Sequence, residues 1–366
     1  VYKRQMQIEH AYLAPKAGAI RAQVNKSVFV AGRINQPQLA EQVLASGQAD
    51  MCGMTRALIS DPDMPNKAKD GRLDDIRACI GCNQACIGHY HMGVRISCIQ
   101  HPVTGREREL LPHPKTRTAK HVVVVGGGPA GMKAAAIAAE RGHRVTLCEA
   151  AGQLGGQALL AQQLPGRAEF GGIVTNLRRE MDLADVEIRL RCRVDLAQIE
   201  ALCPDAIIMA TGATPYLPDV DLGADVHAVN AWQVLNGEVN PGQSVVIADW
   251  RCDWVGLGLA EKLAREGSHV RLCVDGEMAG QNLQKYLRWH WIGQIHKLGV
   301  EMVPYARFFG AMGDTAFFMH TLSGDAIECA NMDTLIIAQG HRPETGIETA
   351  LRSTGKPLTL AGDCRS

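Results

Sequence analysis

The chain has 366 residues, of which 46% are hydrophobic and 21% charged, an ordinary composition for a packed globular protein of two or three domains. Its 38 basic and 38 acidic side chains balance, which excludes a long-range field for nucleic acid or an acidic membrane surface. No apolar run approaches the roughly 20 residues of a membrane span, and no signal peptide begins the chain. Without a secretory signal, the twelve cysteines indicate a reducing, cytoplasmic compartment.

The N-terminal part of the sequence predicts a βαβ unit. Residues 27–34 have the pattern of a short buried strand, residues 37–46 that of a helix, and residues 49–56 that of the next strand. Strand, helix and strand at this short spacing predict parallel strands. The first of these strands ends in Gly32-Arg33, and the second continues through Gly53-Met-Thr-Arg56.

Four cysteines follow within 20 residues, spaced Cys79-x2-Cys82-x3-Cys86-x11-Cys98. Thiolates bind iron and zinc alike, so ligand type alone does not identify the metal. Structural zinc usually prefers two separated CxxC or CxxH halves, whereas three close thiolates and a distant one suit the corners of an iron–sulfur cube. We therefore predict a [4Fe–4S] cluster, with zinc and unliganded buried cysteines as the alternatives.

A proline- and glycine-rich linker, residues 101–118, leads to a second βαβ unit with a glycine-rich turn. The strand Val122–Val125 is followed by Gly126-x-Gly128-x-x-Gly131, a helix, and a strand that ends at Glu149. Such glycines let the backbone close on a pyrophosphate at the helix N-terminus, and the acid can accept hydrogen bonds from ribose hydroxyls. The turn therefore predicts an adenine-nucleotide site, the alternative being a structural turn with nothing bound.

A third unit of the same layout begins about 123 residues further along the chain, but its turn differs. Asp249 and Arg251 stand where the first turn has glycines, and the segment is two residues longer. Bulky side chains prevent close approach of the backbone, and Asp249 together with Asp253 would repel a pyrophosphate. This unit is predicted to bind NAD(P) poorly, if at all. The alternative is a displaced site formed around Gly256 and Gly258.

These pieces, in this order, resemble the iron–sulfur flavoproteins that include trimethylamine dehydrogenase and 2,4-dienoyl-CoA reductase. The segment Asp61-Pro-Asp-Met-Pro65…Lys67…Gly71…Asp75-Ile-Arg77…Cys79-Ile-Gly-Cys82 is similar to that family's link from barrel to cluster. The resemblance implies an α/β fold that contains the C-terminal end of a TIM barrel, a four-cysteine iron–sulfur loop and two Rossmann-like dinucleotide-binding domains. The implied boundaries are 1–75 for the barrel end, 76–118 for the loop and linker, 119–235 plus 340–366 for the FAD/ADP domain, and 236–339 for the inserted NAD(P)-like domain.

The resemblance also implies cofactor-binding residues. FMN phosphate would contact Gly32, Arg33, Gly53, Met54, Thr55 and Arg56, since backbone amides and an arginine fork are what a phosphate requires. FAD or ADP would contact Gly126, Gly128, Pro129, Ala130, Gly131, Glu149, Gln157, Gly362 and Asp363. A surface ion pair is the alternative role for the two arginines. The family's substrate-facing acid and base lie upstream of these segments, so the catalytic residues are unknown.

Two reactions compete within this resemblance. In an amine dehydrogenase-like enzyme, an N-methylated amine such as dimethylglycine or N-methylproline reduces FMN, and electrons leave through the cluster to an external acceptor such as an electron-transfer flavoprotein. In a 2,4-dienoyl-CoA reductase-like enzyme, NAD(P)H supplies the electrons instead. The segment at Asp249 favours the first reaction. A non-catalytic electron-transfer subunit is the third hypothesis, and a homo-oligomer or a second subunit would fit any of them.

Overall fold

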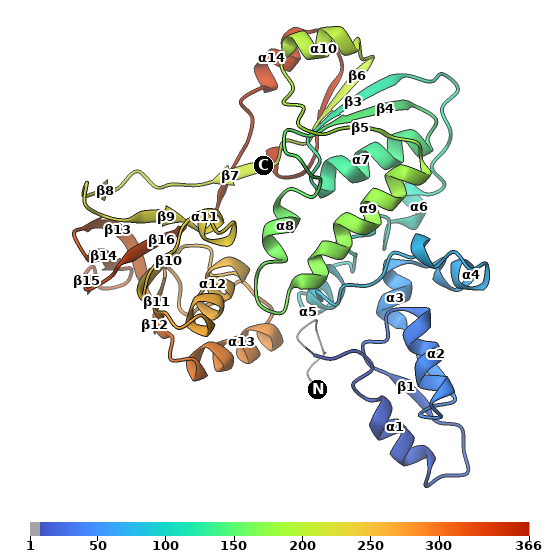
Figure 1. Ribbon diagram of the computed structural model, residues 1–366, viewed down its shortest axis with the longest axis horizontal. Helices are drawn as coiled ribbons and strands as arrows, with labels where there is room; N and C mark the ends of the chain where they lie inside the picture. Colours follow the sequence, from blue (N-terminus) through green and yellow to red (C-terminus); the bar gives the residue numbers. More distant parts are fainter. Residues whose placement is uncertain (1–7, 366) are drawn as a thin grey trace. The chain divides into compact units, whose positions relative to one another are not determined.

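The structure, a computed structural model, describes residues 8–365 (Figure 1). The chain divides into two compact units. The first unit comprises the residues up to Leu159, Gly166–Gly212 and Thr345–Arg365, and the second comprises Leu160–Pro165 and Ala213–Glu344. Among the described residues, every helix is too short or too polar to cross a lipid bilayer.

The N-terminal part of the first unit is the predicted βαβ arrangement, preceded by one helix. Its elements are α1 (Ala14–Arg21), β1 (Phe29–Ala31), α2 (Pro37–Ala45) and β2 (Met51–Gly53). The two strands pair in parallel, with Val30 opposite Cys52, which confirms the prediction. Helix α2 begins at Pro37 because a proline's fixed φ suits the first helical position. The small core consists of Ala11, Ala14, Ala17, Val30, Ile34, Val43 and Ala49.

A segment of short helices connects this part to the first sheet. They are α3 (Thr55–Ser60), α4 (Met64–Lys69), η1 (Leu73–Asp75), η2 (Gln84–Gly88), α5 (His89–His91) and α6 (Glu107–Leu110). The buried Asp61 carboxylate accepts hydrogen bonds from Lys67 Nζ at 2.7 Å and from the Arg77 backbone N–H at 2.8 Å. Arg77 Nε in turn lies 2.8 Å from the carboxylate of Glu180. These bonds give the Asp61–Arg77 pattern a structural role, because they connect the segment to Glu180, which belongs to a helix of the first unit's sheet layer.

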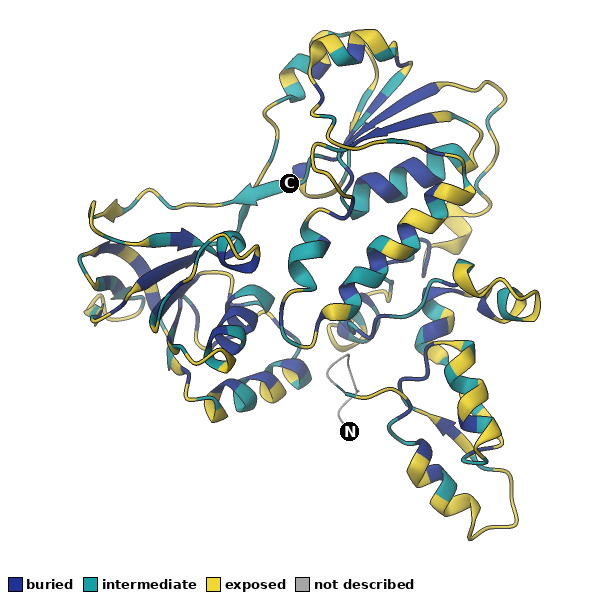
Figure 2. Ribbon diagram, viewed as in Figure 1, coloured by how far each residue is buried: buried dark blue, intermediate teal, exposed yellow. Residues whose placement is uncertain are grey.

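The first unit contains a five-stranded parallel sheet. In spatial order its strands are β18 (Leu358–Leu360), β6 (Ala206–Met209), β3 (His121–Val125), β4 (Arg144–Cys148) and β5 (Glu187–Arg189). Its helices are α7 (Pro129–Glu140), α8 (Gln157–Ala161), η3 (Ala168–Phe170), α9 (Gly171–Leu183), α10 (Leu196–Leu202), α14 (Glu348–Ser353) and η4 (Gly362–Cys364). Val123 and Val125 pack against α10 and α14, while α7 covers the opposite face and packs against α9 (Figure 1). Every residue of β3 is buried, as Figure 2 shows in dark blue.

The second unit contains another five-stranded parallel sheet and a smaller sheet packed on it. The parallel sheet has the order β12 (Glu301–Val303), β11 (His269–Val274), β10 (Ser244–Asp249), β16 (Thr334–Ala338) and β9 (Ala228–Asn230). The smaller sheet has the order β15 (Ala326–Cys329), β14 (Thr315–His320), β13 (Ala306–Met312) and β8 (Asp221–Leu222). Helices α11 (Ala231–Leu235), α12 (Trp254–Arg265) and α13 (Lys285–Lys297) pack on the other side of the parallel sheet.

The division between the units lies at residues 212/213 and 344/345, whereas the sequence suggested 235/236 and 339/340. The difference has a physical cause. Strand β9 pairs with β16 in the second sheet, so the segment that carries β9 belongs to the second unit. A two-stranded antiparallel ribbon of β7 (Ala213–Pro215) and β17 (His341–Pro343) leads into and out of that unit.

Candidate functional site

The first glycine turn, residues 126–131, joins β3 to α7 in a conformation that only glycine allows. Gly126 has a φ of +111°, and a Cβ on it would lie 2.2 Å from the Ala210 carbonyl oxygen. A Cβ on Gly131 would lie 1.9 Å from the carbonyl oxygen of Gly126. Real side chains do not approach this closely, so both glycines are required for the strand and helix to meet.

Gly128 differs from these two glycines because its missing side chain faces open space. A Cβ on Gly128 would meet no atom within 4 Å. This residue is the N-cap of the 12-residue helix α7, with Pro129 as the first helical residue. The free N–H groups and the dipole of a helix N-terminus favour an anion. Binding of a pyrophosphate at this helix end stays a prediction, and the open position of Gly128 leaves room for an anion there.

Predicted residues from three distant segments gather at this helix end. A Cβ on Gly156 would lie 3.1 Å from Gly128 Cα, and one on Gly362 would lie 2.6 Å from Ala130 Cβ. The Gln157 side-chain amide donates to Asp363 Oδ2 at 3.2 Å. The fold thus brings residues 126–131, 155–157 and 362–363 together, as expected for one nucleotide site. Their contact with FAD or ADP stays a prediction.

Glu149 directly follows β4 and reaches back to the first glycine turn. Its Oε2 accepts the Gly127 backbone N–H at 2.7 Å, and its Oε1 accepts the Ala151 backbone N–H at 2.6 Å. These bonds hold the carboxylate beside the turn, and each oxygen keeps a second lone pair for a ribose hydroxyl. The backbone therefore orients this carboxylate beside the turn, and its contact with a ribose stays a prediction.

The second turn, residues 249–256, lies at the same place in the second unit but is filled by its own side chains. Asp249 is 1% exposed, and its Oδ1 accepts the Cys252 backbone N–H at 3.0 Å. Its Oδ2 has no hydrogen-bond partner among the described residues and faces Gly256, where a Cβ would come within 2.1 Å. Burial, reinforced by the nearby Asp253 charge, raises the pKa of Asp249 to about 8.

The first turn of α12 is also closed to an incoming phosphate. Asp253 caps the helix through the Val255 backbone N–H at 3.0 Å, and its other oxygen forms an ion pair with Arg251 Nε at 2.8 Å. The Arg251 side chain packs against Gly340, and the cavity beside these residues has a volume of only about 10 Å³. Ligand pockets are typically about 300–1,000 Å³. The alternative of a displaced site at Gly258 gains no support, because a Cβ there would meet Leu164 at 2.8 Å.

Sequence reasoning missed Asp275, which directly follows β11 as Glu149 directly follows β4. Its Oδ2 lies 3.2 Å from Arg307 Nε, while its buried Oδ1 has no hydrogen-bond partner among residues 8–365. The signal that could have found it is the same as for Glu149, an acid at the end of the second strand of a βαβ unit. The second unit therefore has an acid at the position that Glu149 occupies in the first unit, although its turn is closed.

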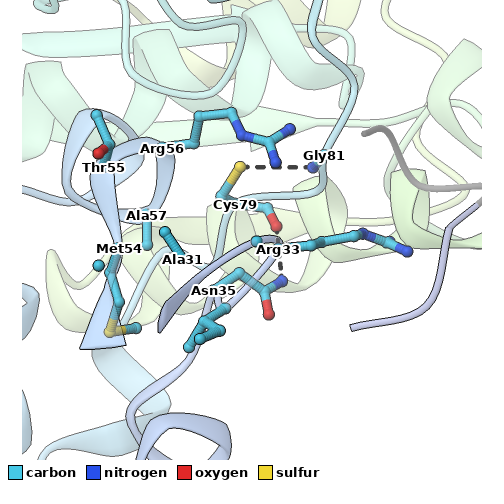
Figure 3. Close-up of a pocket in the computed structure, with 12 residues that line it drawn as sticks. Ala31, Arg33, Asn35, Met54, Thr55, Arg56, Ala57, Cys79 and Gly81 are labelled. Atoms are coloured by element: carbon cyan, nitrogen blue, oxygen red, sulfur yellow. Dashed lines mark hydrogen bonds between the residues drawn. The ribbon is translucent and has the colours of Figure 1, made fainter. Parts of the chain in front are cut away.

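The six predicted FMN-phosphate residues line a single cavity at the ends of β1 and β2 (Figure 3). Its volume is about 180 Å³. Sequence reasoning missed two further contributions, Asn35 and the cysteine-loop residues Cys79 and Gly81. The Asn35 side-chain amide donates to the Cys79 carbonyl oxygen at 2.8 Å, so this cavity and the cysteine loop are joined directly.

Arg33 and Arg56 make different contacts around this cavity. Arg33 has a φ of +53°, is 7% exposed, and forms an ion pair with Glu169. Burial, together with the neighbouring Arg56 charge, lowers the pKa of Arg33 to about 10. Arg56 donates to the side-chain oxygen of Asn83, in the cysteine loop. The ion pair considered for Arg33 thus exists, but it is buried rather than at the surface.

The four cysteines of the predicted cluster lie in one loop around η2. Cys79 and Cys82 precede this helix, Cys86 lies within it, and Cys98 follows α5. All four are free thiols of intermediate exposure. Burial raises the pKa of Cys82 to about 12 and also raises the pKa values of Cys79 and Cys86.

The backbone around the cysteine loop is suited to thiolate ligands. The Cys79 sulfur accepts the Gly81 backbone N–H at 3.4 Å, and backbone groups at Gln84 and Ile87 partly offset the rise in the pKa values of Cys82 and Cys86. Hydrogen bonds to sulfur are one of the ways in which proteins tune iron–sulfur centres. However, among the described residues no three His, Cys, Asp or Glu side chains converge as a metal site does. Ligation of a cluster by these cysteines therefore stays a prediction.

Two protein families match the chain. Residues 120–359 match the pyridine nucleotide-disulphide oxidoreductase family, and residues 3–75 match the NADH:flavin oxidoreductase / NADH oxidase family. The first match covers both dinucleotide-binding units, and the second covers the βαβ part at the N-terminus. The predicted fold class, a barrel end followed by Rossmann-like domains, is confirmed.

The curated relatives include proteins named as a dehydrogenase, a demethylase and an NADH oxidase. The chain is 41% identical to N,N-dimethylglycine/sarcosine dehydrogenase of Chromohalobacter salexigens, over 93% of this chain and 51% of the relative. It is 38% identical to NADH oxidase of Thermoanaerobacter brockii, over 79% and 44%, respectively. It is 37% identical to the Rhizobium meliloti protein named Probable N-methylproline demethylase, over 74% and 41%. The resemblance suggested by the sequence is confirmed.

Solved structures agree with this fold along the whole chain. A 2-naphthoyl-CoA reductase complex matches with a TM-score of 0.91 and 26% identity, covering 99% of this chain and 55% of that chain. The chain spans about half the length of the curated relatives it matches.

Proposed function

Because the chain belongs to the pyridine nucleotide-disulphide oxidoreductase family, we propose that the full-length protein oxidatively demethylates an N-methylated amine such as dimethylglycine. An N-methyl C–H bond loses its hydrogen and two electrons, which leaves an iminium ion. Water adds to the iminium carbon, and the C–N bond breaks to release formaldehyde and the demethylated amine. When bound, FMN would supply the two-electron acceptor, and [4Fe–4S] the one-electron relay to an external acceptor such as an electron-transfer flavoprotein.

The residues of this chain would hold the cofactors. Arg56, with Arg33 and the backbone at Gly53, would neutralise and orient the FMN phosphate. Cys79, Cys82, Cys86 and Cys98 would ligate the cluster. The helix N-terminus at Gly128 would hold the pyrophosphate of FAD or ADP, with Glu149 on the ribose.

The observation that carries this proposal is the contrast between the two turns. The first turn leaves space at Gly128, whereas the second is filled by the Asp249 carboxyl and covered by Arg251. An enzyme that draws electrons from NAD(P)H would need the second site to be open. The closed turn favours electron entry from an organic substrate instead, and the amine-demethylating relatives supply the substrate class.

An NADH-dependent reductase is the second candidate, and Asp275 favours it. An acid at the end of the second strand accepts the ribose hydroxyls of NADH and repels the 2′-phosphate of NADPH. A relative named NADH oxidase is consistent with such a role. This candidate predicts reduction by NADH but not by NADPH.

Anaerobic titration of the full-length protein tests the proposal. We expect dimethylglycine to bleach the flavin and cluster absorbance, while NADH and NADPH leave both unchanged. The Arg56→Ala variant should lose bleaching by the amine through loss of FMN. Arg21→Ala, which removes a surface ion pair with Asp50 and a hydrogen bond to the Gly47 carbonyl oxygen, should respond as the wild type does.

Rapid bleaching by NADH alone would overturn the demethylase assignment and support the reductase. If neither nicotinamide nor amine changes the spectrum, even with an artificial acceptor, the protein is a non-catalytic electron-transfer subunit. Formaldehyde release in proportion to amine consumed distinguishes demethylation from simple amine binding.

A further inference from the structure

Two cysteines of the second unit lie in contact although they are 56 residues apart in the chain. Cys273 is near the end of β11 in the parallel sheet, and Cys329 is the last residue of β15 in the smaller sheet. Their sulfur atoms are 3.6 Å apart. Both side chains belong to the apolar core between the two sheets, where they are 0% and 3% exposed. The pair is distant in sequence from the cysteine loop.

The surroundings make the two thiols chemically unequal. Arg271, two residues before Cys273 on β11, donates to the carbonyl oxygen of Ala330, the residue after Cys329, so its positive charge lies near the Cys329 sulfur. The hydrogen bond from Cys273 and the Arg271 guanidinium lower the pKa of Cys329. The same hydrogen bond and burial raise the pKa of Cys273 well above its ordinary value. Cys329 is therefore the nucleophile of the pair, because the thiolate is the reactive form.

We propose that Cys273 and Cys329 form a reversible disulfide when the protein meets hydrogen peroxide. The Cys329 sulfur attacks one peroxide oxygen, the O–O bond breaks, and water leaves as Cys329 becomes a sulfenic acid. The Cys273 sulfur then attacks the Cys329 sulfur, the S–O bond breaks, and a second water leaves. The two thiols lose two electrons, and hydrogen peroxide is reduced to two molecules of water.

The position of Cys329 gives a small oxidant access. Strand β15 has only four residues and lies at the edge of its sheet, and local opening of such a short edge strand would expose Cys329 to a small oxidant. Burial of both sulfurs excludes bulky disulfides, whereas hydrogen peroxide is little larger than water. Reduced flavins generate this oxidant from dioxygen, so a flavoprotein meets it locally.

The sulfur atoms need little movement to bond. An S–S bond is about 2.05 Å long, so the pair must close by about 1.5 Å from its present 3.6 Å. The bond would link β11 of the parallel sheet covalently to β15 of the smaller sheet. It would enclose residues 274–328, including both β13 and β14.

Peptide mapping of the full-length protein tests this proposal. The native protein is treated with hydrogen peroxide, alkylated under denaturing conditions, digested and analysed by mass spectrometry. We expect a linked peptide pair that contains Cys273 and Cys329, and its loss after treatment with dithiothreitol. Cys252, which is equally buried and whose sulfur donates to the backbone oxygens of Asp249 and Trp250, is the internal control and should be recovered alkylated.

Variants separate the disulfide from general oxidation. Cys329→Ser should leave Cys273 fully alkylated, and Arg271→Met should slow the linkage at least about threefold, whereas Arg307→Met on β13 should leave its rate unchanged. All five tryptophans lie in the second unit, so tryptophan fluorescence verifies that each variant is folded. Recovery of both cysteines as free thiols after peroxide treatment, or linkage of Cys329 to a different cysteine, would overturn the proposal.

Discussion

The two units each contain a parallel sheet with a strand–turn–helix layout, but different atoms fill the space between the strand and the helix. In the first unit, Gly131 packs on the backbone carbonyl of Gly126. In the second, Gly256 packs on the carboxyl of Asp249, which stands where the first unit has Gly126. Both units keep a buried central strand and a helix of 12 residues behind the turn.

This difference separates what holds the fold from what binds a ligand. The sheets and helices depend on apolar cores that are complete in both units. The capacity to take a pyrophosphate depends on whether the space in front of one helix end is open, as at Gly128, or occupied by the chain itself. A Rossmann-like sheet and its helices can therefore be complete although the space in front of one helix end is filled.

The largest expected effect comes from adding one methyl group to the first turn. Gly131→Ala should lower the free energy of unfolding of the first unit by about 3 kcal/mol, because its Cβ would collide with a backbone carbonyl that cannot move aside. Gly128→Ala should cost less than about 1 kcal/mol, because its methyl group points into open space. Urea unfolding monitored by circular dichroism measures the free energy of unfolding of each variant.

The same pair of variants separates folding from ligand binding. Gly128→Ala should weaken ADP binding at least about tenfold in calorimetry while the protein stays folded. Equal stability losses for the two variants would contradict the contacts described at the turn. Unchanged ADP affinity in Gly128→Ala would show that the nucleotide lies elsewhere.

The second prediction concerns the pH dependence of the second unit. Asp249 has an ordinary pKa of 3.8 when unfolded and a pKa of about 8 when folded, so the folded state binds more protons between these values. Its contribution to stability is complete below about pH 4 and is lost as the pH rises through about 8. The free energy of unfolding should fall by about 2 kcal/mol between pH 5 and pH 7, allowing for local relaxation.

Tryptophan fluorescence during urea unfolding reads this change in the second unit alone. Asp249→Asn keeps the shape of the side chain but cannot titrate, so the slope between pH 5 and pH 7 should disappear. A wild-type slope that survives in this variant would assign the pH dependence to another group.

The smallest expected effect comes from the cap of α12. Asp253→Ala removes the oxygen that accepts the Val255 N–H and should lower the free energy of unfolding of the second unit by about 1 kcal/mol. Tryptophan fluorescence at pH 5 measures the loss. Asp195 caps α10 in the first unit, so Asp195→Ala is the matched control and should leave this fluorescence transition unchanged.

Much of the fold was predictable because its local patterns are strong. The all-valine strand, the glycine turn and the helix that follows it predicted β3 and α7. The smaller sheet of the second unit was not anticipated. Its strands depend on pairing across hairpins and on burial against β10 and β11, which local patterns do not reveal.

The candidate site was likewise predictable only where its residues follow a local sequence pattern. The glycines and cysteines have recognisable spacings, so they could be proposed from the sequence. The hydrogen bond from Gln157 to Asp363 spans 206 residues, and that from Asn35 to Cys79 depends on how two loops meet. The sequence suggested that bulky side chains would block this turn and that Asp249 together with Asp253 would repel a pyrophosphate. The structure adds that the buried Asp249 carboxyl fills the space beside Gly256, an orientation that only tertiary packing determines.

The interlocking of Asp249 with Gly256 has a consequence for mutational paths. Replacing Asp249 with glycine would remove the carboxyl and leave a void beside Gly256. The two extra residues of the turn and the Arg251–Asp253 ion pair would remain. Each change alone would lose packing or leave a charge without its partner, and none alone would open the site. Opening this turn for a dinucleotide would therefore require several substitutions at once, because no single substitution removes all the side chains that fill it.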